Sequence, residues 1–289
     1  MQYEGAVYRP PSEAGSFILQ VTIGCARNTC TFCTMYKDKT FRMRHMDEIL
    51  ADIEEVHAYY GDRIRRIFLA DGDALIMPAD RLLEILAALR EHFPSAERIT
   101  SYGAPKDVLG KTPEELAALR EAGLSMIYMG LESGDDEVLR HVKKGASSGE
   151  IVEAGQKLKA AGMQTSITLI SGLGGRRLLR EHAVHSAEAI SAMRPDYVGF
   201  LTLMVERGAP MREELERGEM ELLTPEEVAE EMELFLTHVD AEGCVFRSNH
   251  ASNYIMLGGT LNRDIPAMLQ QLRKAREEGV FRSERWRAL

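Results

Sequence analysis

The stretch SFILQVTI (residues 16–23) runs directly into GCARNTCTFCTMY (residues 24–36), and this junction indicates both the fold and the chemistry of the chain. The first segment is short, apolar and rich in β-branched residues, which predicts a buried strand. The second segment places Cys25, Cys30 and Cys33 within nine residues, whereas the fourth cysteine, Cys244, stands alone far downstream. Since four cysteines are too few for a disulfide framework at this length, the clustered thiols predict a metal-binding or catalytic site.

Beyond this junction, short β-rich runs alternate with amphipathic helical patterns. The further predicted strands are 65–70, 98–102, 126–130, 165–171, 196–203 and 244–248, and the predicted helices are 46–60, 80–93, 113–122, 148–161, 179–193 and 225–240. Thr112 and Thr224, each followed by proline, are typical N-cap residues. This alternation predicts parallel βα units. Because no G-x-G-x-x-G follows the first strand, a barrel is favoured over two doubly wound halves.

We therefore predict an α/β fold, namely a partial (β/α) barrel of the TIM type with a C-terminal helical extension. No internal repeat or Pro/Gly-rich linker divides the chain, so residues 1–289 are predicted to be one domain. Its core covers about residues 14–205, and its substrate-side extension covers about residues 206–289. In such barrels the chemistry collects at the C-terminal ends of the strands.

The composition is that of an ordinary globular chain. Its 289 residues include 35 Lys and Arg against 45 Asp and Glu, for a net charge of −10, with 45% hydrophobic and 28% charged residues. These proportions exclude a disordered acidic tail or a collagen-like filament. No apolar run reaches the roughly 18 residues of a membrane span and no secretory signal is visible, so we expect a soluble, cytoplasmic protein without membrane contact. The acidic balance argues against binding to duplex nucleic acid.

The cysteine spacing alone allows two metal centres. Short loops of thiolates are typical of iron–sulfur clusters, whereas zinc would need Cys244 or a distant histidine as its fourth ligand. A cluster held by three thiolates leaves one iron without a protein ligand, and a small molecule can bind at that open position.

GCARNTCTFC after a first strand, with an aromatic residue just before the last cysteine, resembles the radical S-adenosylmethionine (radical SAM) enzymes. Their usual cysteine spacing is three and two residues, whereas this chain has four and two. The resemblance runs from about residue 9 to about residue 205 and is closest to the branch of anaerobic coproporphyrinogen oxidase, Elp3-like and methylthiotransferase-like enzymes. It implies an oxygen-sensitive [4Fe–4S] cluster on Cys25, Cys30 and Cys33, with S-adenosylmethionine (SAM) chelating the fourth iron. Reductive cleavage of SAM would then give a 5′-deoxyadenosyl radical that abstracts hydrogen from the substrate.

The same resemblance implies a set of contacts to SAM. They are Phe32 near the adenine, Gly72 and Asp73 in LADGDAL (69–75), Glu132 in MGLESG (129–134) at the ribose, Lys144 at the SAM carboxylate and Thr168 at the ribose. The residue types alone also allow plainer interpretations. Asp71-Gly72-Asp73 can be a simple turn, and Lys143-Lys144 can be a solvated helix end favoured by the helix dipole.

The predicted catalytic residues on the substrate side are Asn249 and His250, in FRSNHASNY (246–254) directly after an apolar strand. Glu206 and Arg207 have a similar position after the sixth strand. A surface loop is the alternative interpretation. The substrate is unidentified, with a small molecule or peptide favoured, and a flavodoxin or ferredoxin is expected as reductant. Two other classes stay open: a zinc-stabilised hydrolase or lyase, and an iron–sulfur sensor or electron carrier without SAM turnover.

Overall fold

The structure of the protein is a computed structural model that describes residues 1 and 3–288. The chain divides into two compact units. The first comprises Met1–Asn28, Met35–Met129 and Lys157–Thr165, and the second comprises Thr29–Thr34, Gly130–Gln156 and Ser166–Leu289.

Eight mainly parallel strands follow one another in the order β1-β4-β5-β6-β7-β8-β9-β10, which is also their order along the chain. In the described residues this order is not closed into a ring. The strands and the helices between them confirm the predicted partial (β/α) barrel.

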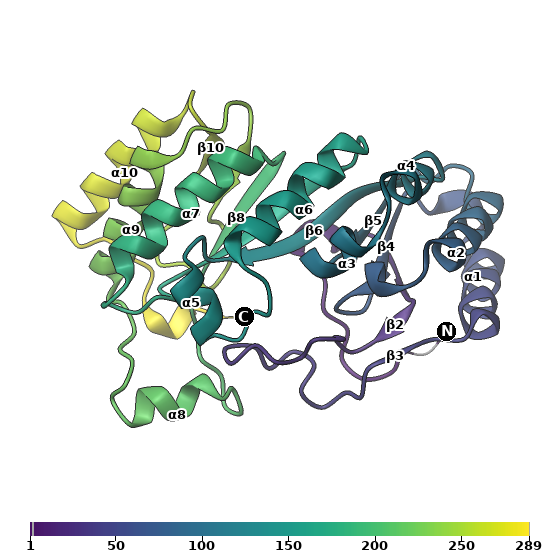
Figure 1. The fold of residues 1–289 in the computed structure, drawn as a ribbon, viewed down its shortest axis with the longest axis horizontal. Coiled ribbons are helices and arrows are strands. Elements are labelled where there is room, and N and C mark those ends of the chain that lie inside the picture. The colour runs from purple at the N-terminus through teal and green to yellow at the C-terminus, as the bar shows by residue number, and fades with distance from the viewer. Residues whose placement is uncertain (2, 289) are drawn as a thin grey trace. The chain divides into compact units, whose positions relative to one another are not determined.

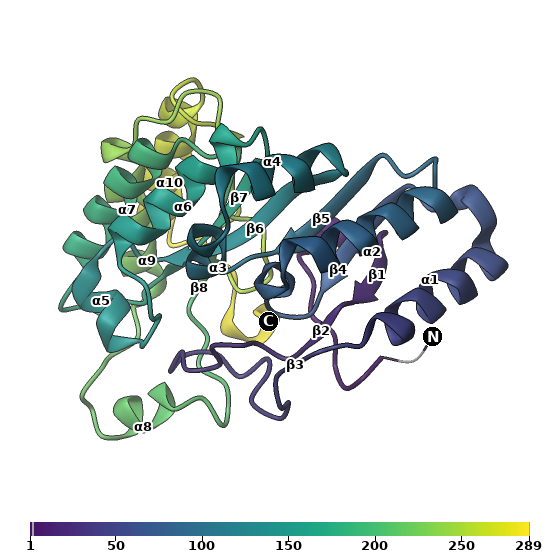
Figure 2. The same ribbon diagram turned by 45° about the vertical axis from the view of Figure 1, so that its right-hand side comes forward.

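The first unit is built on the parallel strands β1 (Phe17–Gln20), β4 (Arg66–Ala70), β5 (Arg98–Tyr102) and the beginning of β6 (Leu124–Glu132). Gln20 lies beside Ala70, and Leu69 beside Ser101, so these strands end at one common edge. The further elements of this unit are β2 (Thr22–Ile23) paired with β3 (Arg42–Met43), the helices α1 (Met46–Tyr60), α2 (Ala79–His92), α3 (Pro105–Gly110) and α4 (Pro113–Glu121), and the short turns η1 (Pro11–Glu13), η2 (Gly61–Arg63) and η3 (Ala74–Ile76). Helices α1 and α2 lie side by side along the strands (Figures 1 and 2).

Both faces of these strands are covered. Phe68 packs with Met126 and Tyr128 on one side of the strands. Successive residues of a strand point to opposite sides, and Ile67 and Leu69 are fully buried as well. Burial on both faces is what a parallel sheet flanked by helices requires.

The second unit contains most of β7 (Gln164–Ser171) with β8 (Tyr197–Thr202), β9 (Val245–Arg247) and the antiparallel β10 (Gly258–Thr260). Its helical elements are α5 (Asp136–His141), most of α6 (Ser148–Ala160), α7 (Leu179–Met193), α8 (Met211–Glu216), α9 (Pro225–His238), α10 (Ile265–Glu278) and η4 (Glu284–Trp286). Helix α9 packs against both α7 and α10 (Figures 1 and 2).

Six of the seven predicted strands and all six predicted long helices are confirmed, with bounds that differ by a few residues at most. The predicted strand 16–23 is divided into β1 and β2, which belong to different sheets. The predicted caps are confirmed as well. The hydroxyls of Thr112 and Thr224 each accept a hydrogen bond from the amide three residues on, and the glutamates at those positions reciprocate, as in a capping box. Helices α8 to α10 occupy the predicted C-terminal extension, whereas β3, β10, α3 and α5 were not predicted.

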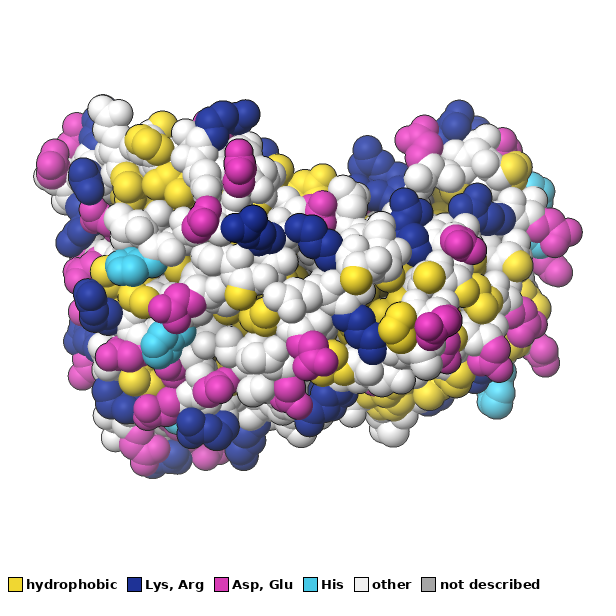
Figure 3. Space-filling model, turned by 45° about the horizontal axis from the view of Figure 1, so that its top comes forward, with side chains coloured by type: hydrophobic (Ala, Val, Ile, Leu, Met, Phe, Trp, Pro, Cys, Tyr) yellow, Lys and Arg dark blue, Asp and Glu magenta, His cyan; other side chains and the backbone are white. Residues whose placement is uncertain are grey.

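The helices of the described residues are too short or too polar to cross a membrane. On the face drawn in Figure 3, Lys and Arg side chains are interspersed with Asp and Glu, and no continuous basic surface covers that face.

Candidate active site

In the first unit, the turn after β4 passes closely beside Cys25. The amide of Gly72 donates a hydrogen bond to the carbonyl of Gly24 over 3.2 Å. A Cβ atom on residue 72 would lie 2.6 Å from Cε2 of Tyr36 and 3.0 Å from Cβ of Cys25. Only glycine therefore allows this approach of the β4 turn to the first cysteine.

Asp73 presents a buried acceptor at the same turn. It is 1% exposed, and its Oδ1 accepts a hydrogen bond from the amide of Ala104 over 3.1 Å, whereas its Oδ2 has no partner. Burial, and then the neighbouring Asp107, raise the pKa of Asp73 well above its usual value. An acidic side chain in this condition can hold a proton or a bound cation.

Asp107 interacts with both Asp73 and Arg27, and the sequence did not identify Arg27 as a site residue. The guanidinium of Arg27 forms an ion pair with Asp107 over 3.2 Å, yet Nε of Arg27 is buried without a partner. The hydroxyl of Tyr36 and the carboxylate of Asp71 lie within reach of each other, although neither that hydroxyl nor Oδ1 of Asp71 has a hydrogen bond of good geometry. Leaving a buried polar atom unpaired costs about 1–3 kcal/mol, so several of them near one strand end are typical of a ligand site.

In the second unit, the segment Thr29–Thr34 with Cys30 and Cys33 is held by the end of α5. The amide of Thr31 donates to the carbonyl of Val142 over 3.0 Å, and the amide of Met211 donates to the carbonyl of Thr31 over 3.0 Å. The Thr29 hydroxyl donates to the carbonyl of Lys143 over 3.1 Å. Phe32 packs against an apolar cluster of Val138, Val142, Ile170, Leu173, Leu203 and Met211.

Two of the predicted SAM contacts meet in the second unit. Nζ of Lys144 lies 2.8 Å from Oε1 of Glu132, and both side chains are mostly buried. Glu132 has a positive φ of 64° at the end of β6. A Cβ atom on Gly130 would lie 1.8 Å from Oε1 of Glu132, so this glycine is required for the bent Glu132 side chain.

Thr168 lies within β7 rather than at its end. It pairs with Gly199 of β8 and is half-buried. Because side chains alternate along a strand, Thr168 shares a face with Ile170, which belongs to the apolar cluster around Phe32.

The polar run after β9 divides into anchoring residues and candidate site residues. Asn253 is fully buried and bonds to the carbonyl of Phe200 over 2.7 Å, so it stabilises the end of β8. Asn249 is exposed and His250 is half-buried. Nδ1 of His250 accepts a hydrogen bond from the amide of Ser252 over 3.2 Å, and burial lowers the pKa of the imidazole.

The residues after β8 make one contact of interest. Glu206 accepts a hydrogen bond from the hydroxyl of Thr34, the residue after Cys33. Arg207 is exposed. Glu206 therefore lies beside the end of Thr29–Thr34, the segment that carries Cys30 and Cys33.

The three clustered cysteines belong to different units. Cys25 lies in the first, and Cys30 and Cys33 lie in the second. All three are half-buried, whereas Cys244 is buried. Among residues 1 and 3–288, no group of three or more His, Cys, Asp and Glu side chains is arranged to hold a metal ion. The assignment of the three thiolates as iron ligands therefore stays a prediction.

Comparisons with known proteins agree with this fold. Residues 19–188 match the Radical SAM superfamily. Heme chaperone HemW of Mycobacterium tuberculosis (strain CDC 1551 / Oshkosh) is 25% identical over 206 residues, which cover 70% of this chain and 51% of HemW. The structure of methylornithine synthase (PylB) aligns with a TM-score of 0.55 and 18% identity over 90% of this chain and 81% of that chain. Coproporphyrinogen III oxidase (HemN) from Escherichia coli aligns with a TM-score of 0.57 and 18% identity over 77% of this chain and 52% of that chain.

The structural likenesses show the fold, and the chain spans about half the length of the HemW protein that it matches. The superfamily match covers more than half of the chain, and proteins of this superfamily use a [4Fe–4S] cluster and SAM, which favours iron over zinc at the cysteines. The chain belongs to the radical SAM superfamily.

Proposed function

We propose that this chain binds a [4Fe–4S] cluster through Cys25, Cys30 and Cys33 and uses it to cleave SAM reductively. A bound cluster would supply the single electron that this cleavage needs, and the 5′-deoxyadenosyl fragment of SAM would then serve to abstract hydrogen from the substrate. The observation that carries this proposal is the set of unpartnered buried atoms near Cys25, which includes Nε of Arg27 and Oδ2 of Asp73.

These unpartnered atoms fit the methionine end of SAM. Asp73 is buried and its Oδ2 lacks a hydrogen bond of good geometry, so a bound ammonium group would offset the repulsion between Asp73 and Asp107. Nε of Arg27 is a free donor, suited to the carboxylate group. Charge-assisted hydrogen bonds of this kind are about twice as strong as neutral ones, so this chain would both bind SAM and orient it.

The contacts proposed for the adenosine part come from the second unit. Glu132 would accept hydrogen bonds from the ribose hydroxyls while Lys144, its ion-pair partner, holds the carboxylate in place or moves to the SAM carboxylate. Thr168 is proposed as a second ribose contact, and Phe32 as an apolar contact to the adenine.

Asn249 and His250 are proposed to face the substrate. Since Nδ1 of His250 accepts a backbone hydrogen bond, its neutral ring carries the proton on Nε2 and can donate it to an acceptor on the substrate. The substrate is proposed to be a small molecule or a peptide, and a flavodoxin or ferredoxin is proposed as the electron donor.

The test is anaerobic reconstitution followed by SAM cleavage under dithionite, with 5′-deoxyadenosine and methionine measured by mass spectrometry. The wild type is expected to bind about four irons and to form both products. Cys30→Ser should lose most of the iron and the products, because a hydroxyl replaces a thiolate ligand poorly, whereas Cys244→Ser should keep both.

Each other outcome favours an alternative. Stoichiometric zinc without iron would support the zinc-stabilised barrel. A stable cluster that forms no 5′-deoxyadenosine would support a sensor or electron carrier. Equal iron loss in Cys30→Ser and Cys244→Ser would show that Cys244 is a ligand, and the three-thiolate site would be wrong.

A further inference from the structure

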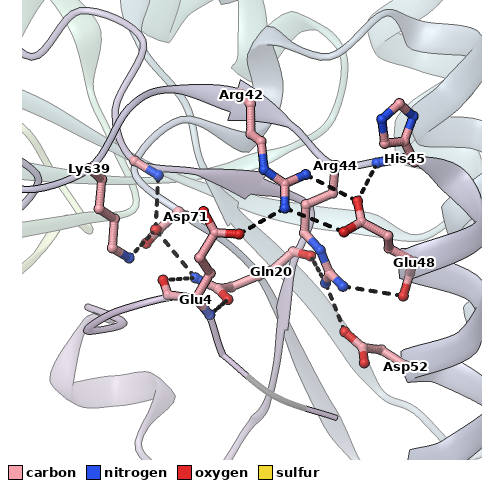
Figure 4. Close-up of polar contacts among 10 residues, drawn as sticks. Glu4, Gln20, Lys39, Arg42, Arg44, His45, Glu48, Asp52 and Asp71 are labelled. Atoms are coloured by element: carbon pink, nitrogen blue, oxygen red, sulfur yellow. Dashed lines mark hydrogen bonds and ion pairs between the residues drawn. The ribbon is translucent and has the colours of Figure 1, made fainter.

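A buried ion pair lies at the start of the turn after β4. Nζ of Lys39 lies 2.7 Å from Oδ2 of Asp71, and their side chains are only 4% and 0% exposed (Figure 4). The same carboxylate oxygen accepts hydrogen bonds from the amide of Gly24 over 3.1 Å and from Nε2 of Gln20 over 3.4 Å. The amide of Asp71 in turn donates to the hydroxyl of Thr22 over 3.2 Å.

The two main donors come from opposite ends of the cysteine segment. Gly24 directly precedes Cys25, and Lys39 follows Cys33 by six residues. One carboxylate oxygen thus contacts both ends of residues 24–39, although Asp71 is distant from both in sequence. It adds to the antiparallel pairing of β2 with β3, which joins the residues on either side of the segment. Lys39 is itself fixed further, because its ammonium also donates to the carbonyl of Ala6.

We propose that Asp71 and Lys39 form a clamp that closes the cysteine segment before the cluster is inserted. The proposal rests on the proposed function in one respect, namely that this segment holds the cluster. Both are positioning residues, since neither is proposed to touch iron or SAM.

The physical argument concerns the entropy of the segment. Bringing the ends of a flexible loop together costs conformational entropy, and each residue that becomes ordered adds to that cost. A clamp that is already closed in the cluster-free protein removes this cost from the step in which the cluster binds. A charge-assisted contact shielded from water is strong enough to keep the ends closed.

The chain offers a matched control in the same unit. Arg44 and Asp52 form a second ion pair over 2.7 Å, with side chains that are 10% and 11% exposed (Figure 4). Arg44 also donates to the carbonyl of Gln20 over 2.8 Å. Neither residue lies within residues 24–39, so loss of this pair should destabilise the unit without opening the cysteine segment.

The experiment compares Lys39→Met/Asp71→Asn with Arg44→Met/Asp52→Asn. Removing both partners avoids an unpaired buried charge, which is the severe case. Hydrogen exchange of the cluster-free proteins, followed by mass spectrometry of peptides within residues 25–38, reports closure of the segment. Release of iron from the reconstituted proteins to a chelator reports retention of the cluster.

In the clamp variant, exchange within residues 25–38 and iron release are both expected to be roughly ten-fold faster than in the wild type, the change expected for losing one charge-assisted hydrogen bond. In the control variant both rates should stay near the wild-type values. Equal rates in the two variants would overturn the proposal, as would faster exchange spread over the whole first unit.

Two further variants keep the test decisive. If the double clamp variant does not fold, Lys39→Gln, which loses the charge but keeps a donor to the Asp71 carboxylate, should change the same two rates in the same direction. Lys39→Arg should restore slow exchange, and failure to do so would contradict a role for the charge. If the wild type binds no cluster, the proposed function fails, whereas hydrogen exchange of the cluster-free variants still decides whether the clamp exists.

Discussion

Gly72→Ala is the smallest change that reaches the proposed cluster site. Its added Cβ would lie 2.6 Å from Cε2 and 3.0 Å from Cζ of Tyr36, and 3.0 Å from Cβ of Cys25. Optimal carbon–carbon contacts are about 3.5–4.0 Å, so the methyl group overlaps its nearest neighbour by roughly 1 Å. Gly72 does not have a positive φ, so the expected effect comes from this overlap and not from backbone strain.

The overlap cannot be relieved by moving a flexible side chain. Tyr36 is 5% exposed, and its ring packs edge-on against Tyr8 with centroids 5.4 Å apart. Overpacking of this kind costs about 1–3 kcal/mol. Since each kcal/mol lowers Tm by about 2–4 °C in a chain of 150–250 residues, we expect a loss of several degrees. The turn must also move away from Cys25, so cluster binding should fall sharply.

Gly103→Ala is the matched control. Its Cβ would lie 2.9 Å from Cγ2 of Ile127 and 3.0 Å from Cδ2 of Leu75, so it also overpacks the first unit but does not approach a cysteine. Both variants are measured by calorimetry without the cluster and by iron content after anaerobic reconstitution. Both should lose stability, but only Gly72→Ala should lose most of its iron. If the two variants retain equal amounts of iron, the β4 turn does not form part of the cluster site.

Three further predictions concern buried carboxyl groups and the two sides of the site. The pKa of Asp73 is higher in the folded protein than in the unfolded chain, so the fold loses stability as pH rises and this carboxyl ionises. Asp73→Asn removes the ionisation and should therefore raise the stability of the cluster-free protein at pH 7, measured by thermal unfolding. The same variant should weaken SAM binding in calorimetric titration, and equal SAM affinity would contradict the proposed ammonium contact. Glu231 is fully buried, and burial raises its pKa. The wild type should therefore lose stability as pH rises above the pKa of this group in the unfolded chain, and Glu231→Gln should lose less over the same pH range. If the two proteins show the same dependence of stability on pH, Glu231 is ionised at little cost. Glu132→Ala should weaken SAM binding roughly ten- to hundred-fold, the change expected for a buried charge-assisted hydrogen bond, whereas His250→Ala should leave SAM affinity intact and reduce turnover of substrate. The reverse pattern would mean that the cofactor and substrate sides are exchanged.

The regular elements of the fold were predictable because their signals are local. Helix α1 has the same bounds as the predicted helix 46–60, since its buried residues Ile49, Ile53 and Val56 recur at helical spacing. Apart from α10, a helix of 14 residues in the predicted C-terminal extension whose bounds were not predicted, the elements not predicted are short. Helices α3 and α5 have six residues each, too few for a periodic pattern, and β10 consists of Gly258–Thr260, whose glycines have low strand propensity.

The site was predictable only in part, because its polar contacts join distant residues. The sequence identified Glu132 and Lys144 separately through a resemblance, and the structure pairs them over 2.8 Å. It did not single out Arg27 or Asp107, which form an ion pair across 80 residues of chain. Asp71 was interpreted as part of a turn, because nothing in a linear sequence shows that its carboxylate accepts hydrogen bonds from Lys39 and Gly24.

The unpartnered atoms and the clamp are two aspects of one arrangement. Near Cys25, the first unit leaves Nε of Arg27 and Oδ2 of Asp73 without a hydrogen bond of good geometry, and leaving a buried polar atom unpaired costs about 1–3 kcal/mol. Unpaired buried atoms persist close together only where the surrounding structure fixes their positions, and the Asp71–Lys39 pair beside them contributes to fixing those positions. A ligand that satisfies these groups recovers their cost on binding, and anything that binds the native state more tightly than the unfolded state stabilises the fold. On the proposed function, the same residues that lower the stability of the empty protein would provide binding energy for SAM, which is why a substitution such as Asp73→Asn is expected to change stability and affinity in opposite directions.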